Sequence, residues 1–168
     1  KDIINKLSFS SNEKFNSNSL HNLSLAEKYS KKQDLFDVTS DVILGLRDII
    51  SDLNPDLTLV HGDTTTAMAA SLSCFYLQHK VAHVEAGLRT FNIFAPFPEE
   101  FNRRIVGILS NLHFSPTKDS KNNLINEGIE KADIFVTGNT VIDAIQFVQK
   151  KINKSKKLNT SLRDSLES

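Results

Sequence analysis

The sequence lacks several features that would assign it to a class at once. Its 168 residues include one cysteine and no tryptophan, and 20 Lys and Arg balance 20 Asp and Glu. A single cysteine cannot form an internal disulfide framework. Zero net charge argues against nucleic-acid binding by phosphate neutralisation and against a polybasic membrane anchor. There is no run of about 18 apolar residues, so we expect no transmembrane helix.

An initiator methionine is also missing, because the chain starts at Lys1 and its single methionine is Met68. We therefore expect an internal piece of a longer protein, or a processed or incomplete one. The first residues lack the apolar core of a signal peptide, which favours a cytoplasmic location. A composition with 39% hydrophobic and 24% charged residues is typical of a globular domain.

What is present is an alternation of short apolar runs with segments of helical periodicity. Strands are expected at 56–61, 81–84, 113–115 and 133–137, and helices at 35–52, 65–78, 98–110, 118–127 and 140–152. A helix end at 2–7 and a weak strand at 20–26 are further candidates. The alternation predicts an α/β fold with a Rossmann-like parallel sheet covered by helices on both faces. Cys74 lies in an apolar helical stretch and is expected in the core.

Three acidic positions follow the expected strands or the loop beyond one. They are Asp63, Glu85 and Glu99. Ligands of parallel sheets bind outside the carboxyl ends of the strands, so these carboxylates can converge in one cleft and divide acid and base roles. Each has a simpler interpretation. Asp63 could cap the following helix, unless Thr64 does so, and Glu99 could merely complement a helix dipole.

A metal site is the competing interpretation of the same region. His61 and Asp63 form one His-x-acid pair, and His83 and Glu85 form a second on what could be the adjacent strand. The spacing is not typical of zinc ligands, so we expect no metal. The sequence also contains neither G-x-G-x-x-G nor a Walker A motif, which leaves no standard phosphate-binding loop.

Five sequence motifs appear in a fixed order. Together they identify a protein family more narrowly than the physical properties of their residues do. They are Val60-His-Gly-Asp-Thr-Thr-Thr66, His83-Val-Glu-Ala-Gly-Leu-Arg-Thr90, Pro96-Phe-Pro-Glu-Glu-Phe-Asn-Arg103, His113-Phe-Ser-Pro-Thr117 and Val136-Thr-Gly-Asn-Thr-Val-Ile-Asp143. With them the chain resembles the non-hydrolysing UDP-N-acetylglucosamine 2-epimerases of bacterial cell-envelope sugar synthesis. The resemblance is strong from about 52 to 148 and weaker before that.

The resemblance implies an isomerase with two Rossmann-like domains in the GT-B arrangement. Residues 1–152 would be part of the first domain, and 153–168 a polar tail or the start of the connection. It implies conversion of UDP-GlcNAc to UDP-ManNAc by elimination and re-addition of UDP, without NAD or metal, in a homodimer. Asp63, Glu85 and Glu99 would be catalytic, with Asp63 and Glu85 also binding the UDP-sugar.

The departures from the family matter as much. The family's opening strand, its Gly-Thr-Arg-Pro-Glu loop and its second domain have no counterpart here, so the chain alone is expected to be inactive. A hydrolysing relative and an epimerase of a related UDP-diacetamido sugar remain alternatives, and a retaining GT-B glycosyltransferase is a weaker one. A non-catalytic truncated relic is the alternative outside enzymes.

Overall fold

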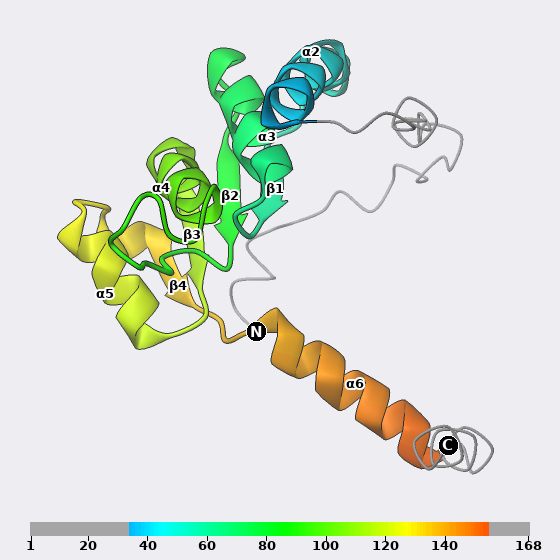
Figure 1. Cartoon of the computed structure of the whole chain (residues 1–168). Helices are drawn as coiled ribbons and strands as arrows, with labels where there is room; N and C mark the ends of the chain where they lie inside the picture. The colour runs from blue at the N-terminus through cyan, green and yellow to red at the C-terminus, as the bar shows by residue number, and fades with distance from the viewer. Residues whose placement is uncertain (1–33, 155–168) are drawn as a thin grey trace. The chain divides into compact units, whose positions relative to one another are not determined.

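The computed structural model describes residues 34–154. The elements of this part are α2 (Leu35–Leu53), β1 (Thr58–His61), α3 (Thr65–Tyr76), β2 (Val81–Val84), α4 (Glu99–Leu109), β3 (Leu112–Ser115), α5 (Lys118–Asn126), the 3-10 helix η2 (Lys131–Asp133), β4 (Ile134–Val136) and α6 (Thr140–Lys154) (Figure 1). Every strand and helix expected from residue 35 onward is confirmed within a few residues. The candidates at 2–7 and 20–26 and most of the tail lie outside the described residues.

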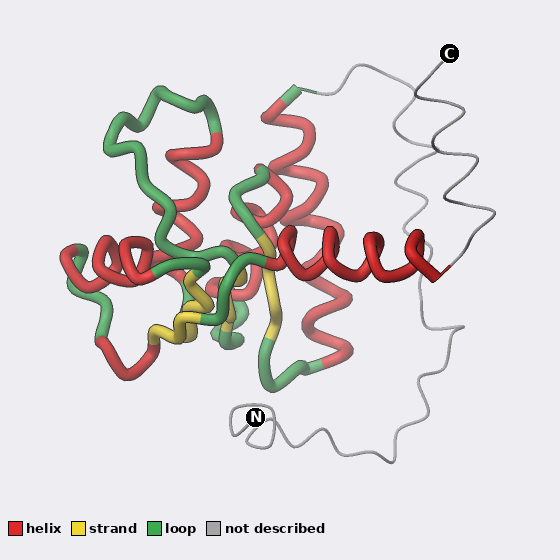
Figure 2. Tube along the Cα trace, turned by 90° about the horizontal axis from the view of Figure 1, so that it is seen from below, coloured by secondary structure: helices red, strands yellow, loops and turns green. Residues whose placement is uncertain are grey.

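The four strands form one parallel sheet in the order β1-β2-β3-β4. His83 on β2 pairs in register with Val60 on β1 and with His113 on β3. The expected α/β fold with a parallel sheet is therefore confirmed. Figure 2 shows the strands in yellow and the longer connecting helices in red.

One face of the sheet carries the core. Val60 and Val81 pack in a buried cluster with side chains of α2, α3 and α4, among them Ile50, Met68 and Val106. Cys74 belongs to this cluster and is fully buried, as expected. Leu124 of α5 closes a second cluster with Ala86 and Ile134. The helices α2 to α5 therefore share one face of the sheet.

On the opposite face of the sheet, residues 34–154 leave apolar side chains partly uncovered. Leu59 is 58% exposed, and Phe114 and Phe135 are half-buried, with their rings 5.9 Å apart. The strand order explains this, because each right-handed crossover steps in the same direction and puts its helix on the same side. In residues 34–154 no helix is long and apolar enough to cross a membrane.

Candidate active site

The turn after β1 lies directly against the end of β2. The backbone N–H of Gly62 donates to the carbonyl of Val84 at 3.0 Å. A Cβ added to Gly62 would lie 3.6 Å from Oε2 of Glu85. Asp63 follows Gly62 immediately, so the sheet edge brings the turn that carries Asp63 and the Glu85 carboxylate into the same place.

Thr64, and not Asp63, caps the helix that follows. The Thr64 side chain accepts the backbone N–H of Ala67 at 3.1 Å, and Thr64 has an extended backbone typical of an N-cap. The cap interpretation of Asp63 was wrong for this reason: the neighbouring threonine hydroxyl fills the cap. The Asp63 side chain is left for other contacts and is 27% exposed.

Helix α4 approaches Asp63 from the other side. Asn102 Nδ2 donates to the Asp63 carbonyl at 2.9 Å, and Arg103 Nη2 donates to Asp63 Oδ2 at 2.5 Å. Glu99 lies three and four residues before these two and therefore on the same face of the helix. Its Oε2 is buried and makes no hydrogen bond to the described residues. The third expected carboxylate thus lies on the helix face that meets Asp63.

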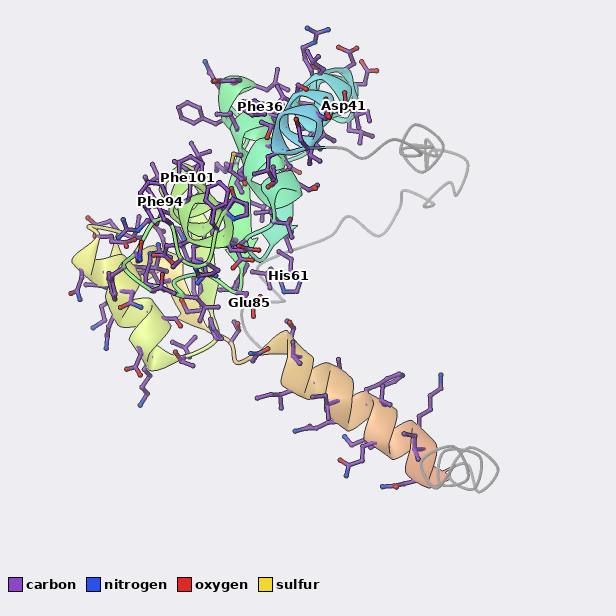
Figure 3. All side chains as sticks on the ribbon, viewed as in Figure 1. Phe36, Asp41, His61, Glu85, Phe94 and Phe101 are labelled. Carbon is purple, nitrogen blue, oxygen red and sulfur yellow. The ribbon has the colours of Figure 1, made fainter. Side chains whose placement is uncertain are left out.

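Glu85 has an unusual backbone. Its φ is 70°, in the left-handed region that non-glycine residues adopt rarely. Its carboxylate Oε2 lies 3.5 Å from His61 Nε2, and the two side chains are 28% and 58% exposed. The pair sits at the ends of β1 and β2 (Figure 3). Glu85 is therefore held in a strained position with an accessible carboxylate.

The second glutamate of the Pro-Glu-Glu string has a structural role. Glu100 is fully buried and accepts the backbone N–H groups of Thr90 and Phe91 at 3.1 and 3.2 Å. It also lies 3.5 Å from Arg103 and 3.4 Å from Arg104. Glu100 thus ties the loop after β2 to the first turn of α4.

Two residues of the Glu-Ala-Gly-Leu-Arg string also serve the fold. The backbone of Gly87 has φ 90°, and a Cβ there would lie 2.1 Å from the Ser120 carbonyl oxygen. The Arg89 side chain is fully buried and pairs through Nε and Nη2 with both oxygens of Glu127, at 2.7 and 2.6 Å. These contacts bring α5 against the loop that follows Glu85.

Two histidines of the sheet, His83 and His113, lie in the core. His83 is buried, and its Nε2 lies 2.8 Å from the carbonyl oxygen of Gly62. Burial is the main cause that lowers the pKa of His83 to about 4, and burial likewise lowers the pKa of His113. Both are therefore neutral near pH 7. Within residues 34–154 there is no group of three or more His, Cys, Asp or Glu that could hold a metal ion.

The structure therefore places the turn that bears Asp63 beside the Glu85 carboxylate at one sheet edge, and the helix face that carries Glu99 contacts Asp63 through Asn102 and Arg103. Such a site can take and give protons and hold a polar ligand, because carboxylates are general acids and bases. Sequence reasoning did not single out Asn102 and Arg103. The signal that could have found them is their spacing of three and four residues from Glu99 on one helix.

Comparisons with known proteins agree with the motifs. A family model described as UDP-N-acetylglucosamine 2-epimerase matches residues 5–167. The UDP-N-acetylglucosamine 2-epimerase of Campylobacter jejuni is 49% identical over 136 residues, which is 81% of this chain and 36% of the relative.

Solved structures give the same result. The UDP-GlcNAc 2-epimerase of Neisseria meningitidis bound to UDP-GlcNAc is similar with a TM-score of 0.77 and 48% identity, over 79% of this chain and 36% of that one. The Methanocaldococcus jannaschii enzyme in complex with UDP-GlcNAc and UDP has a TM-score of 0.73 and 36% identity over the same shares. The chain thus spans about a third of the length of these relatives.

Proposed function

The chain belongs to the UDP-N-acetylglucosamine 2-epimerase family, and from this membership we propose that it forms part of an enzyme that interconverts UDP-GlcNAc and UDP-ManNAc. The observation that carries the proposal is the convergence of the turn bearing Asp63 on the Glu85 carboxylate, at the edge where parallel sheets bind ligands. Similar proteins were solved with UDP-GlcNAc and with UDP.

The proposed reaction explains why carboxylates are needed. The C2 proton of the sugar is not next to a carbonyl, so its removal must be coupled to departure of UDP. A base takes the C2 proton, the C–H electron pair forms a C1–C2 double bond, and the C1–O bond to UDP breaks. UDP then adds back to C1 while a proton is delivered to the opposite face of C2. No NAD or metal takes part in these steps.

Asp63, Glu85 and Glu99 are the proposed catalytic residues. Asp63 and Glu85 are the preferred pair for proton transfer and substrate binding, with Glu99 in support. The buried Glu99 oxygen that accepts no hydrogen bond from residues 34–154 supports a role toward a ligand, because buried polar atoms in proteins are normally satisfied. The strained φ of Glu85 supports the same assignment.

We further propose that residues up to 152 are part of a first Rossmann-like domain of a GT-B enzyme, and that the remaining chain leads toward a second domain. The exposed apolar face around Leu59 supports this, because parallel sheets are normally covered on both faces. In this proposal most contacts to UDP come from outside the chain, so the 168 residues alone are inactive.

The proposed enzyme is non-hydrolysing, acts in the cytoplasm where nucleotide sugars are made, and is a homodimer when full length. The exposed apolar side chains of Leu44 and Tyr76 on α2 and α3 support an interface. The subtype rests on the Gly-Asp-Thr-Thr-Thr and Glu-Ala-Gly-Leu-Arg strings. A hydrolysing enzyme or one specific for a UDP-diacetamido sugar is the second candidate.

The experiment is product analysis by NMR with UDP-GlcNAc as substrate and the full-length enzyme as catalyst. UDP-ManNAc as the product supports the proposal, whereas free ManNAc with UDP would identify a hydrolysing enzyme. The same assay on the 168-residue chain should give no conversion, and measurable conversion would refute the proposed partial site.

A further inference from the structure

We propose that Arg103 is a positioning residue, which holds Asp63 so that a single carboxylate oxygen faces the substrate. The inference rests on the proposed function, because it gives Asp63 a role in proton transfer. Arg103 itself contacts Asp63 and Glu100 and is not assigned a contact with the sugar.

The first step is the geometry of the pair. Arg103 Nη2 donates to Oδ2 of Asp63 at 2.5 Å, while Oδ1 of Asp63 accepts no hydrogen bond from residues 34–154. A charge-assisted hydrogen bond of this kind restrains the carboxylate strongly. Because one oxygen is engaged by Arg103, the other is the oxygen left for a ligand.

The second step is the rigidity of the arginine. Its side chain is only 12% exposed, and Nη1 lies 3.5 Å from Glu100, which is fully buried. Glu100 is in turn fixed by the backbone N–H groups of Thr90 and Phe91. The guanidinium therefore lies between the buried carboxylate of Glu100, which anchors it, and the partly exposed carboxylate of Asp63, which it orients.

The third step is that α4 also fixes the backbone of the same residue. Asn102 donates to the Asp63 carbonyl at 2.9 Å and lies 3.4 Å from the hydroxyl of Thr65. Two adjacent residues of α4 thus hold both the main chain and the side chain of Asp63. An ordinary surface ion pair restrains only the side chains, whereas here the backbone of Asp63 is held as well.

Arg104 provides a matched control on the same helix. It pairs with the same Glu100, at 3.4 Å, and is 36% exposed, but the structure records no contact between it and Asp63. Replacing Arg104 removes one cation from Glu100 and leaves the Asp63 contact in place. Comparing the two arginines therefore separates support of the fold from orientation of Asp63.

The kinetic test uses the full-length enzyme with Arg103→Gln, Arg103→Lys and Arg104→Gln. We expect Arg103→Gln to lower kcat about 100-fold with KM within about threefold of wild type, because misplacing a reacting group by about 1 Å has this effect. Arg103→Lys, which retains the charge, should have a kcat about tenfold higher than that of Arg103→Gln. Arg104→Gln should stay within about threefold. A folded Arg103→Gln enzyme with wild-type kcat would overturn the proposal.

A second measurement needs no activity. In the 168-residue chain, NMR of the Arg103 guanidinium should show slow rotation about its Cζ–Nη bonds, and Asp63→Asn should make that rotation fast while Asp119→Asn leaves it slow. Fast rotation in the wild-type chain would overturn the proposal. A different outcome would be slow rotation in the 168-residue chain together with a full-length enzyme that does not epimerise UDP-GlcNAc. That outcome would refute the proposed function, whereas the restraint of Asp63 by Arg103 would still hold.

Discussion

Arg89 and Glu127 form a two-point ion pair between the loop after β2 and the end of α5, with Nε and Nη2 of Arg89 at 2.7 and 2.6 Å from the two carboxylate oxygens. The Arg89 side chain is fully buried and that of Glu127 is one third exposed. Arg89 also donates to the Leu88 carbonyl. This pair joins the loop that follows Glu85 to helix α5, so it stabilises the backbone next to the candidate site.

Glu127→Gln should therefore destabilise the chain. The substitution leaves a buried guanidinium without its counter-charge, and partial exposure of Glu127 keeps the expected loss near 2 kcal/mol. Urea denaturation measures the free energy of unfolding. Glu130→Gln is the control, because Glu130 is exposed, and it should change stability by less than about 0.5 kcal/mol. Equal stabilities of the two variants would contradict this role.

Gly87→Ala should be more damaging than Gly128→Ala, although both glycines have φ near 90°. A Cβ at Gly87 would lie 2.1 Å from the Ser120 carbonyl oxygen, so α5 must move, and we expect a loss of roughly 3 kcal/mol. Gly128 faces open space and carries only the cost of its backbone conformation, about 1 kcal/mol. Thermal unfolding of both variants checks the order, and a reversed order would show that the close approach is absent.

Acid should unfold the chain through its buried histidines. Burial lowers the pKa of His83 to about 4 from an ordinary 6.5, so between these values the unfolded state binds a proton that the folded state does not. Stability is thus complete above pH 6.5 and is lost as the pH falls toward 4, by roughly 3 kcal/mol from His83.

Denaturation curves between pH 7 and pH 4 measure this loss. His83→Gln, which can still donate to the Gly62 carbonyl, should flatten the pH dependence, whereas His79→Gln should leave it as in wild type. His79 Nδ1 donates to the Pro55 carbonyl at 3.2 Å, and His79 is not in the sheet. An unchanged pH dependence in His83→Gln would show that His83 is not the group responsible.

Neutralising the proposed catalytic carboxylates should remove activity without unfolding the enzyme. Asp63→Asn, Glu85→Gln and Glu99→Gln in the full-length enzyme should each lower kcat by about 10²–10⁴-fold, the usual contribution of a proton-transfer group. Asp119→Asn, at an exposed position of α5, is the control. Circular dichroism verifies folding. A folded Glu85→Gln enzyme with wild-type kcat would remove Glu85 from the assignment.

How far the sequence alone leads can be seen at particular residues. The strands and helices from residue 35 onward follow from local periodicity, and the position of Asp63 and Glu85 at strand ends follows from them. The cap at Thr64 could not be chosen in advance, because Asp63 and Thr64 are both good N-cap residues and only the folded geometry decides. The local sequence does not show which of these two side chains takes the N-cap position.

The contacts of Asp63 with α4 could not be predicted from local sequence periodicity, for a different reason. Arg103 lies 40 residues from Asp63 in sequence, and the pair exists only because α3 and α4 pack side by side on one face of the sheet. The order of the strands could not be predicted from local periodicity either, and it decides which face of the sheet the helices α3, α4 and α5 cover. That order, β1-β2-β3-β4, is a property of the assembled sheet.

The central claim is tested most directly by following C2 of the sugar. The full-length enzyme is incubated with UDP-GlcNAc in D₂O, and the products are examined by ¹H NMR. The account predicts UDP-ManNAc in which deuterium replaces the C2 hydrogen, since the proton removed by a carboxylate exchanges with solvent before re-addition. UDP-ManNAc that retains the C2 hydrogen, or free ManNAc as the only product, would contradict it.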